Sequence, residues 1–465
     1  MTIAGMSVVE ILEGQQRGEF TPEEVLRAHL DRIEAEDVGA FLRLCPKGSP
    51  GKGLLQGVPV ALGDEVCTEG VETTAGSRIL SGFVPPYQAT LVGKLEGAGA
   101  AVVGKTNLTE FGLSFAMEDA LFQRTQNPWR SGTTPGGAAG GAAAAVAAGQ
   151  APAAVASDTG GDVRIPASFC GVVGFTPTYG RISRYGVIQH APSLTQVGLL
   201  AQKVRDIALL LKVLAGEDPQ DATTLPGELP DFLEKPGEPG SWRIGIAPEA
   251  YRSCAGGDVY QATEELWQRA AEELGWQLVE VDMSWLDLAQ VARRLIAAAE
   301  SSSSLGRYDG VRYGYRAKDA QDMRELFSRT RAEGFGEGVK GEMLLGTYIL
   351  SDQAHYEAYY LQALRARNLV YKSIKDLWQQ VDLILTPTTP RPAGEGETPL
   401  EIFTGPSNLG GLPAISLPCR LVGGLPVGVQ LIAPAGEEGR LLRAAHVLEK
   451  MIDFASSRNG GGQRA

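Results

Sequence analysis

The sequence predicts an α/β protein with a large buried core. Short apolar runs at residues 58–62 and 101–103 are typical of buried strands, and residues 88–97 between them have the pattern of a helix. Residues 242–300 repeat this alternation as strand, helix, strand and helix. Such alternation is typical of α/β domains, and 43% hydrophobic residues suffice for a sizeable core.

Helix signals frame this core. Residues 21–24 (Thr-Pro-Glu-Glu) form a capping box with proline at the first helical position, so a helix is expected to run to about residue 35. A shorter helix is expected near residues 7–17. Residues 136–149 are small and almost all apolar, which predicts a buried helix. The four serines at residues 301–304 favour a loop or a helix cap.

Composition narrows the class of protein. The 465 residues carry a net charge of −13, which argues against direct nucleic-acid binding by this chain alone. The five cysteines form no paired framework, and the four histidines lack metal-ligand spacing. We therefore expect reduced thiols, no metal site and no cofactor.

The sequence contains no apolar run of 18 residues and no charged leader followed by an apolar core. We expect no membrane insertion and a cytoplasmic location. An organellar stroma or matrix is the alternative if a transit peptide has been removed.

Two glycine-rich segments carry the most specific signal. Residues 136–142 are Gly-Gly-Ala-Ala-Gly-Gly-Ala, and residues 157–164 are Ser-Asp-Thr-Gly-Gly-Asp-Val-Arg. They resemble the amidase signature, GGSSGGS followed by SDTGGSxR. Where that family has its two catalytic serines, this chain has Ala138 and Asp162.

A third segment extends the resemblance. Residues 57–65, Gly-Val-Pro-Val-Ala-Leu-Gly-Asp-Glu, are similar to the family pattern G-x-P-x-A-x-K-D-N. Gly63 stands at the position of the catalytic lysine. The resemblance therefore implies a Ser–cis-Ser–Lys triad whose three members are all replaced.

Later segments narrow the resemblance to one branch of the family. Residues 307–314 are RYDGVRYG, residues 345–348 are LGTY, and residues 356–360 are YEAYY. These are similar to the A subunit of the Glu-tRNA(Gln)/Asp-tRNA(Asn) amidotransferase, which works in a heterotrimer.

This resemblance implies the amidase-signature fold, in which many helices flank a central mixed β-sheet. We expect one amidase-like domain over residues 1–465. Its expected parts are N-terminal helices (1–50), the signature core (50–216), a surface linker (218–240), a mostly helical cap (241–380), a return to the core (381–453) and a mobile tail (459–465).

The three replacements predict a loss of amidase chemistry. Ala138 cannot relay a proton and Gly63 cannot accept one, while a charged Asp162 would repel an oxyanion. In a comparable hydrolase, loss of the nucleophile or base costs about 10⁶-fold in turnover. We therefore expect no catalytic residue. The loop of Thr159, Gly160 and Gly161 would remain as a vestigial oxyanion hole.

Substrate recognition is expected to have changed as well. The family's amidotransferase branch has V-K-R-R before LGTY, whereas residues 339–343 here are Val-Lys-Gly-Glu-Met. Both arginines are therefore lost, one of which would bind the donor carboxylate. The acidic residue of the family's C-terminal segment persists as Glu401. Gly341, Glu342 and Glu401 would thus outline a vestigial substrate pocket.

The sequence alone thus favours a catalytically inactive pseudoenzyme that serves as a scaffold or binding subunit, with protein partners in a hetero-oligomeric complex. The alternatives are an amidotransferase A-type subunit that hydrolyses glutamine for tRNA-dependent amidation, or a hydrolase with altered chemistry through Asp162.

Overall fold

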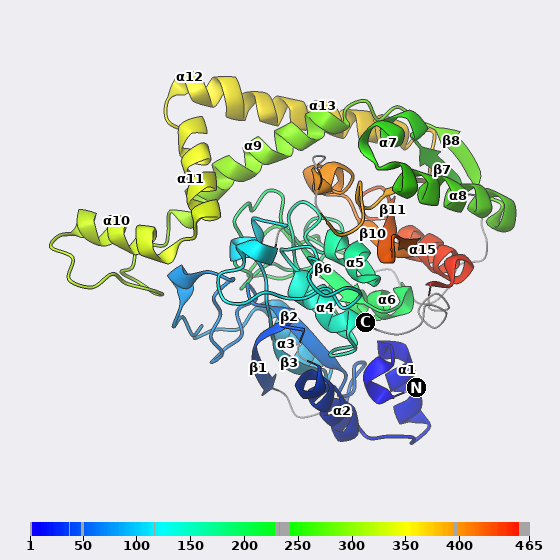
Figure 1. Cartoon of the computed structure of the whole chain (residues 1–465), viewed down its shortest axis with the longest axis horizontal. Helices are drawn as coiled ribbons and strands as arrows, with labels where there is room; N and C mark the ends of the chain where they lie inside the picture. Colours follow the sequence, from blue (N-terminus) through cyan, green and yellow to red (C-terminus); the bar gives the residue numbers. More distant parts are fainter. Residues whose placement is uncertain are drawn as a thin grey trace.

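The fold is built on a single mixed sheet of eleven strands. A computed structural model describes residues 2–36, 38–47, 51–115, 117–227, 232, 242–394, 396 and 399–454. The strand order is β1-β3-β2-β4-β6-β5-β10-β11-β9-β7-β8, and helices cover the sheet (Figure 1). This arrangement confirms the predicted amidase-signature architecture.

The sheet contains both parallel and antiparallel pairs. β2 is parallel to β3 and β4, and β7 is parallel to β8 and β9, whereas the other pairs are antiparallel. The strand bounds are β1 Phe41–Lys47, β2 Pro59–Gly63, β3 Ala101–Thr106, β4 Ala153–Asp158, β5 Val173–Thr176, β6 Gln196–Ala201, β7 Arg243–Ile246, β8 Gln277–Glu280, β9 Leu383–Pro387, β10 Ala414–Val422 and β11 Leu425–Ile432.

The parallel pairing of β2 and β4 positions two of the signature segments. Leu62 pairs with Val155, so the carboxyl ends of both strands lie at the same edge of the sheet. Gly63 ends β2 and Asp158 ends β4. The loop that follows Asp158 therefore begins beside the end of β2.

The two N-terminal helices have the predicted form. α1 (Val8–Gln16) and α2 (Pro22–Ala35) both begin with complete capping boxes, at Ser7 and Thr21 respectively. In each box the hydroxyl accepts from the backbone N–H three residues on, and that residue's glutamate accepts from the capping N–H. These local bonds explain why sequence alone located both helix starts.

The signature helix is shorter than predicted. α4 (Gly140–Ala147) is buried at every position, as expected, but it begins four residues late. Gly136 and Gly137 have φ values of 108° and 57°, which are incompatible with a right-handed helix. They form a turn that leads into α4 instead.

The serine run is helical, which corrects the expectation of a loop or a cap. α9 (Leu286–Leu305) continues through residues 301–304, with Ser301 and Leu305 buried. Its partner α11 (Glu337–Ile349) approaches so closely that a Cβ on Gly346 would lie 2.6 Å from the Ser302 Cβ. Packing of small side chains therefore outweighs the weak helix propensity of serine.

The remaining helices complete the covering layers, and α9 to α13 extend along one side of the molecule (Figure 1). Their bounds are α3 Thr90–Gly97, α5 Arg164–Cys170, α6 Val204–Leu214, α7 Pro248–Cys254, α8 Gly257–Leu274, α10 Met323–Gly334, α12 Gln353–His355, α13 Leu361–Leu377, α14 Gly405–Gly410 and α15 Glu438–Ile452. A π-helical segment spans Tyr356–Tyr360, and short 3-10 turns span Ile3–Gly5, Arg78–Leu80, Glu110–Gly112, Met117–Asp119 and Leu400–Ile402.

Within the described residues, no helix is both long and apolar enough to span a membrane. Nor do these residues group three or more histidine, cysteine or acidic side chains as a metal site would. The predicted tail (459–465) and about half of the predicted linker (218–240) lie outside the described residues. The proposed division of the chain into parts stays a prediction.

Candidate active site

A cavity of about 240 Å³ lies over the loop that follows β4. Chain segments distant in sequence meet there, from the loop after Phe111, the loop after Asp158, α9, α11 and the turn before α14. We call it the Asp162 cavity. Its lining includes Gly112, Leu113, Ser114, Phe115, Thr159, Asp162, His190, Arg293, Arg294, Ala297, Glu342 and Glu401.

Asp158 anchors the loop beneath this cavity. Its fully buried carboxylate accepts two hydrogen bonds of 3.1 Å from the Arg164 guanidinium, and the Gly161 N–H donates to it at 2.8 Å. Thr176 Oγ1 donates to the same carboxylate at 2.8 Å. Burial alone would raise the pKa of Asp158, but the charge and hydrogen bonds of Arg164 outweigh it and hold this pKa well below its usual range.

Asp162 has a very different environment. It is 5% exposed, and its Oδ2 accepts from the Thr159 N–H at 2.8 Å. Burial, and next the negative charge of Asp158, raise the pKa of Asp162 to about 8. The side chain is therefore mostly neutral at pH 7. The raised pKa reduces the negative charge that the sequence analysis assumed at the oxyanion loop.

The predicted oxyanion loop, residues 159–161, is held by these two carboxyl groups. The Thr159 N–H donates to Asp162 and the Gly161 N–H donates to Asp158. Gly160 contacts a guanidinium, because a Cβ added there would lie 2.7 Å from Arg293 Nη1. The loop thus lies under a cation that the sequence analysis did not identify.

Arg293 is the functional candidate that the sequence analysis missed. It is 9% exposed on α9, and its Nη2 donates to Glu401 Oε1 at 2.5 Å. Its Nε has no hydrogen-bond partner among the described residues. One signal was available, because Arg293 directly follows Ala292 on the buried apolar face of α9.

The predicted substrate pocket is only partly assembled. Glu342 from α11 and Glu401 both line the Asp162 cavity, whereas Gly341 is exposed and is not part of the lining. Burial raises the pKa of Glu342. His190 also lines the cavity, and its burial lowers its pKa to about 4, so the ring is neutral at pH 7.

The other two triad positions lie outside this lining. Ala138 is buried, and its N–H donates to Ser114 O at 3.0 Å. At Gly63 a Cβ would lie 2.2 Å from Glu65 Oε2, so the Glu65 carboxylate fills the space in which a side chain at position 63 would begin. The Ser157 N–H holds Glu65 there by donating to its Oε1 at 2.7 Å.

Lys105, considered as a substitute base, does not line the cavity either. Its side chain is fully buried, and its ammonium donates to Val66 O. Burial lowers the pKa of Lys105, although the nearby Asp64 and Glu65 carboxylates oppose this shift. These contacts indicate a structural role behind the end of β2.

The sheet, the signature loop and the cavity define an amidase-signature protein. The Amidase family matches residues 25–442, and the chain belongs to this family. Its relatives point to one branch. The chain is 44% identical to the A subunit of the glutamyl-tRNA(Gln) amidotransferase of Carboxydothermus hydrogenoformans, over 98% of this chain and 99% of that one.

Two further comparisons agree. The corresponding A subunit from Natranaerobius thermophilus is 42% identical over 97% of this chain and 96% of its own. The crystal structure of the A subunit of the glutamyl-tRNA(Gln) amidotransferase from Thermotoga maritima superposes with a TM-score of 0.82 at 37% identity, covering 97% of this chain and 95% of that one.

These relatives correct the functional expectation. We expected no enzyme, because Gly63, Ala138 and Asp162 replace the triad. Full-length relatives at this level of identity are named as amidotransferase subunits, which overturns that expectation. The neutral state of Asp162 removes one physical argument on which it rested.

Proposed function

We propose that this chain is the A-type subunit of a tRNA-dependent amidotransferase and that it releases ammonia from an amide donor in the Asp162 cavity. The observation that carries the proposal is the full-length similarity to the A subunits of glutamyl-tRNA(Gln) amidotransferases. The cavity supports it because it brings together a carboxyl with a raised pKa, two further acidic side chains and two guanidinium groups.

These groups suit hydrolysis by general acid–base catalysis instead of a serine nucleophile. A water oxygen would bond to the amide carbon while its proton passes to Glu342, which burial makes a stronger base than an exposed carboxylate. The C–N bond would then break as nitrogen takes the Asp162 proton and leaves as ammonia. Glutamine and water thus give ammonia and glutamate with a protonated side-chain carboxyl, and the proton on Glu342 returns to Asp162.

Arg293 would supply the electrostatic part of this catalysis. Its guanidinium lies against Gly160 in the oxyanion loop, next to the position where a carbonyl oxygen would gain negative charge. A preorganised cation in a water-poor site stabilises such charge strongly. Glu401 would orient Arg293 through their ion pair.

The relatives are subunits, so we propose that the chain works with protein partners. Its amidotransferase partners, and not this acidic chain, would hold the tRNA. The assembly would act in the compartment that contains the aminoacylated tRNA, which is the cytoplasm in a cell without organelles.

The test is a reconstitution in which the chain replaces the A subunit in the amidotransferase of Carboxydothermus hydrogenoformans. The hybrid should form amidated tRNA with glutamine as donor. Asp162→Asn should lower this rate by about 10²-fold or more, because the amide cannot supply the proton. With added ammonium salt in place of glutamine, the wild-type hybrid and the Asp162→Asn hybrid should amidate tRNA at the same rate.

The matched control is Asp206→Asn. Asp206 is a second buried aspartate with a pKa raised by burial to about 7, but it lies on α6 and does not line the Asp162 cavity. Its variant should keep the glutamine-dependent rate. A wild-type hybrid that amidates tRNA only with ammonium salt would refute hydrolysis by this chain.

A further inference from the structure

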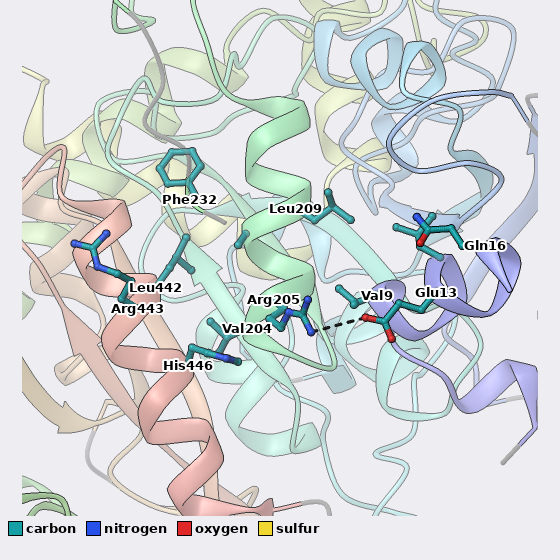
Figure 2. Close-up of a pocket in the computed structure, with 12 residues that line it drawn as sticks. Val9, Glu13, Gln16, Val204, Arg205, Leu209, Phe232, Leu442, Arg443 and His446 are labelled. Carbon is teal, nitrogen blue, oxygen red and sulfur yellow. Dashed lines mark ion pairs between the residues drawn. The ribbon is translucent and has the colours of Figure 1, made fainter. Parts of the chain in front are cut away.

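A second cavity, of about 330 Å³, lies between α1, α6 and α15 (Figure 2). It shares no lining residue with the Asp162 cavity, so the proposed amide chemistry makes no use of it. We call it the His446 cavity. Its volume is at the lower end of the range of about 300–1,000 Å³ that is usual for small-molecule sites.

The walls of the His446 cavity are mostly apolar. Val9 and Leu12 come from α1. Leu209 comes from α6 and Leu442 from α15, and Phe232 adds an aromatic ring (Figure 2). Three helices distant in sequence thus contribute side chains to one apolar space. Such walls favour an aliphatic or aromatic body over a polar one.

One buried polar atom in this cavity lacks a partner. His446 is 9% exposed, and its Nδ1 has no hydrogen-bond partner among the described residues. The nearest carboxylate oxygen, Glu449 Oε2, is 3.7 Å away, which is too far for a hydrogen bond. Leaving such an atom unpaired is unfavourable, so a ligand with a hydrogen-bonding group would gain from reaching it.

Two guanidinium groups add positive charge at the same cavity. Arg443 is half-buried and forms no ion pair or hydrogen bond with any residue that the structure describes. Arg205 lies 3.9 Å from Glu13 Oε1, a loose contact that leaves its donors available (Figure 2). Among the residues that line the cavity, two arginines face one carboxylate, that of Glu13, which favours an anionic group.

We propose that the His446 cavity binds a small molecule with an apolar body and one carboxylate. The body would lie against Val9, Leu209 and Leu442, and the carboxylate would meet Arg443 and His446. Because guanidinium and carboxylate form paired hydrogen bonds, Arg443 would contribute most of the selectivity for an anion.

The test is calorimetric titration of the full-length chain with octanoate and with octylamine, which have the same chain length and opposite charge. Octanoate should bind at one saturable site and raise the midpoint of thermal unfolding. Octylamine should bind at least 10-fold more weakly. Equal binding of the two probes, or no saturable binding of octanoate, would overturn the proposal.

Two variants locate the site. Arg443→Gln should weaken octanoate binding at least 10-fold. Arg440→Gln is the matched control, because Arg440 lies one turn earlier on α15, pairs with Glu437 at 3.4 Å and does not line the cavity. Its affinity should equal that of the wild type. Unchanged affinity in Arg443→Gln would also overturn the proposal.

Discussion

Asp158 ends β4 and Asp162 lies in the loop that follows, and both are buried, yet their pKa values are shifted in opposite directions. Asp158 receives two hydrogen bonds from Arg164 and further ones from Thr176 and Gly161. Asp162 receives one, from the Thr159 N–H, while the nearby Arg293 donates to Glu401 instead. The number and charge of the donors, not burial itself, therefore decide which carboxyl ionises.

This difference distinguishes a carboxyl with a structural role, Asp158, from one in the candidate active site, Asp162. The Arg164–Asp158 pair also binds Ser407, Asn408 and Gln430, and so connects the signature loop to α14 and β11. The Asp162 carboxyl accepts one hydrogen bond, from the Thr159 N–H, and lines the cavity. A carboxyl that remains neutral at pH 7 in a cavity is a common feature of functional sites.

The largest expected effect on stability comes from removing Arg164, whose positive charge keeps Asp158 ionised. Arg164→Leu leaves a buried carboxylate unpaired and should cost about 3–5 kcal/mol in the free energy of unfolding. Urea denaturation measures this loss. Arg420→Leu is the control, since its pair with Glu265 is half-exposed, and it should change stability by less than about 1 kcal/mol. Equal losses would show that the buried network has no special role.

The next effect is the pH dependence caused by Asp162. Its folded pKa of about 8 lies above the usual value, so folding takes up a proton and stability falls as pH rises towards 8. The slope is about 1.4 kcal/mol per pH unit. Asp162→Asn should abolish this contribution. Between pH 5 and 7, the free energy of unfolding of the variant should therefore rise by about 2–3 kcal/mol relative to that of the wild type. Parallel curves from urea denaturation at these pH values would contradict the raised pKa.

Glu65 offers a third buried carboxyl for the comparison. Gly63→Ala pushes a Cβ against Glu65, which the Ser157 N–H holds in place, and should cost about 1–3 kcal/mol. The cost should shrink in a Glu65→Ala background, as a double-mutant cycle would reveal. Gly93→Ala is the control. It lies in α3 with no atom near the added Cβ, so it should be neutral or stabilising by up to about 1 kcal/mol.

The smallest effect concerns Glu401. Its charge raises the pKa of Asp162, whereas Arg293, with which it forms an ion pair, lowers it. Glu401→Gln should therefore move the Asp162 contribution to the pH–stability curve to lower pH, by about one unit or less. Glu272→Gln, an exposed change on α8, should leave the curve in place. A shift to higher pH would contradict the arrangement of charges in the cavity.

Local signals in the sequence located many elements of this fold. The capping box at residues 21–24 and the apolar run at residues 58–62 gave α2 and β2 nearly to the residue, because hydrogen bonds and burial at those places involve close neighbours. The prediction for the serine run at residues 301–304 was wrong because the helical state of this segment of α9 depends on contact with α11, which is distant in sequence.

The candidate site was predictable only in part. The signature motifs identified Asp162 and the loop at residues 159–161, but not the protonation of Asp162, which depends on surroundings contributed by Asp158, Arg293 and Glu401. Arg293 itself enters the site from α9, which is distant in sequence from the loop. The joint replacement of the three triad positions led to the incorrect expectation that the chain is not an enzyme.

The most direct test of this account is the pH profile of ammonia release from glutamine, measured for the reconstituted complex and its Asp162→Asn variant. If neutral Asp162 donates the proton, the wild-type rate should be steady near pH 7 and should fall above about pH 8, as the carboxyl ionises. The variant should be slow throughout. A variant with the wild-type rate and profile would contradict any role of Asp162 in the chemistry.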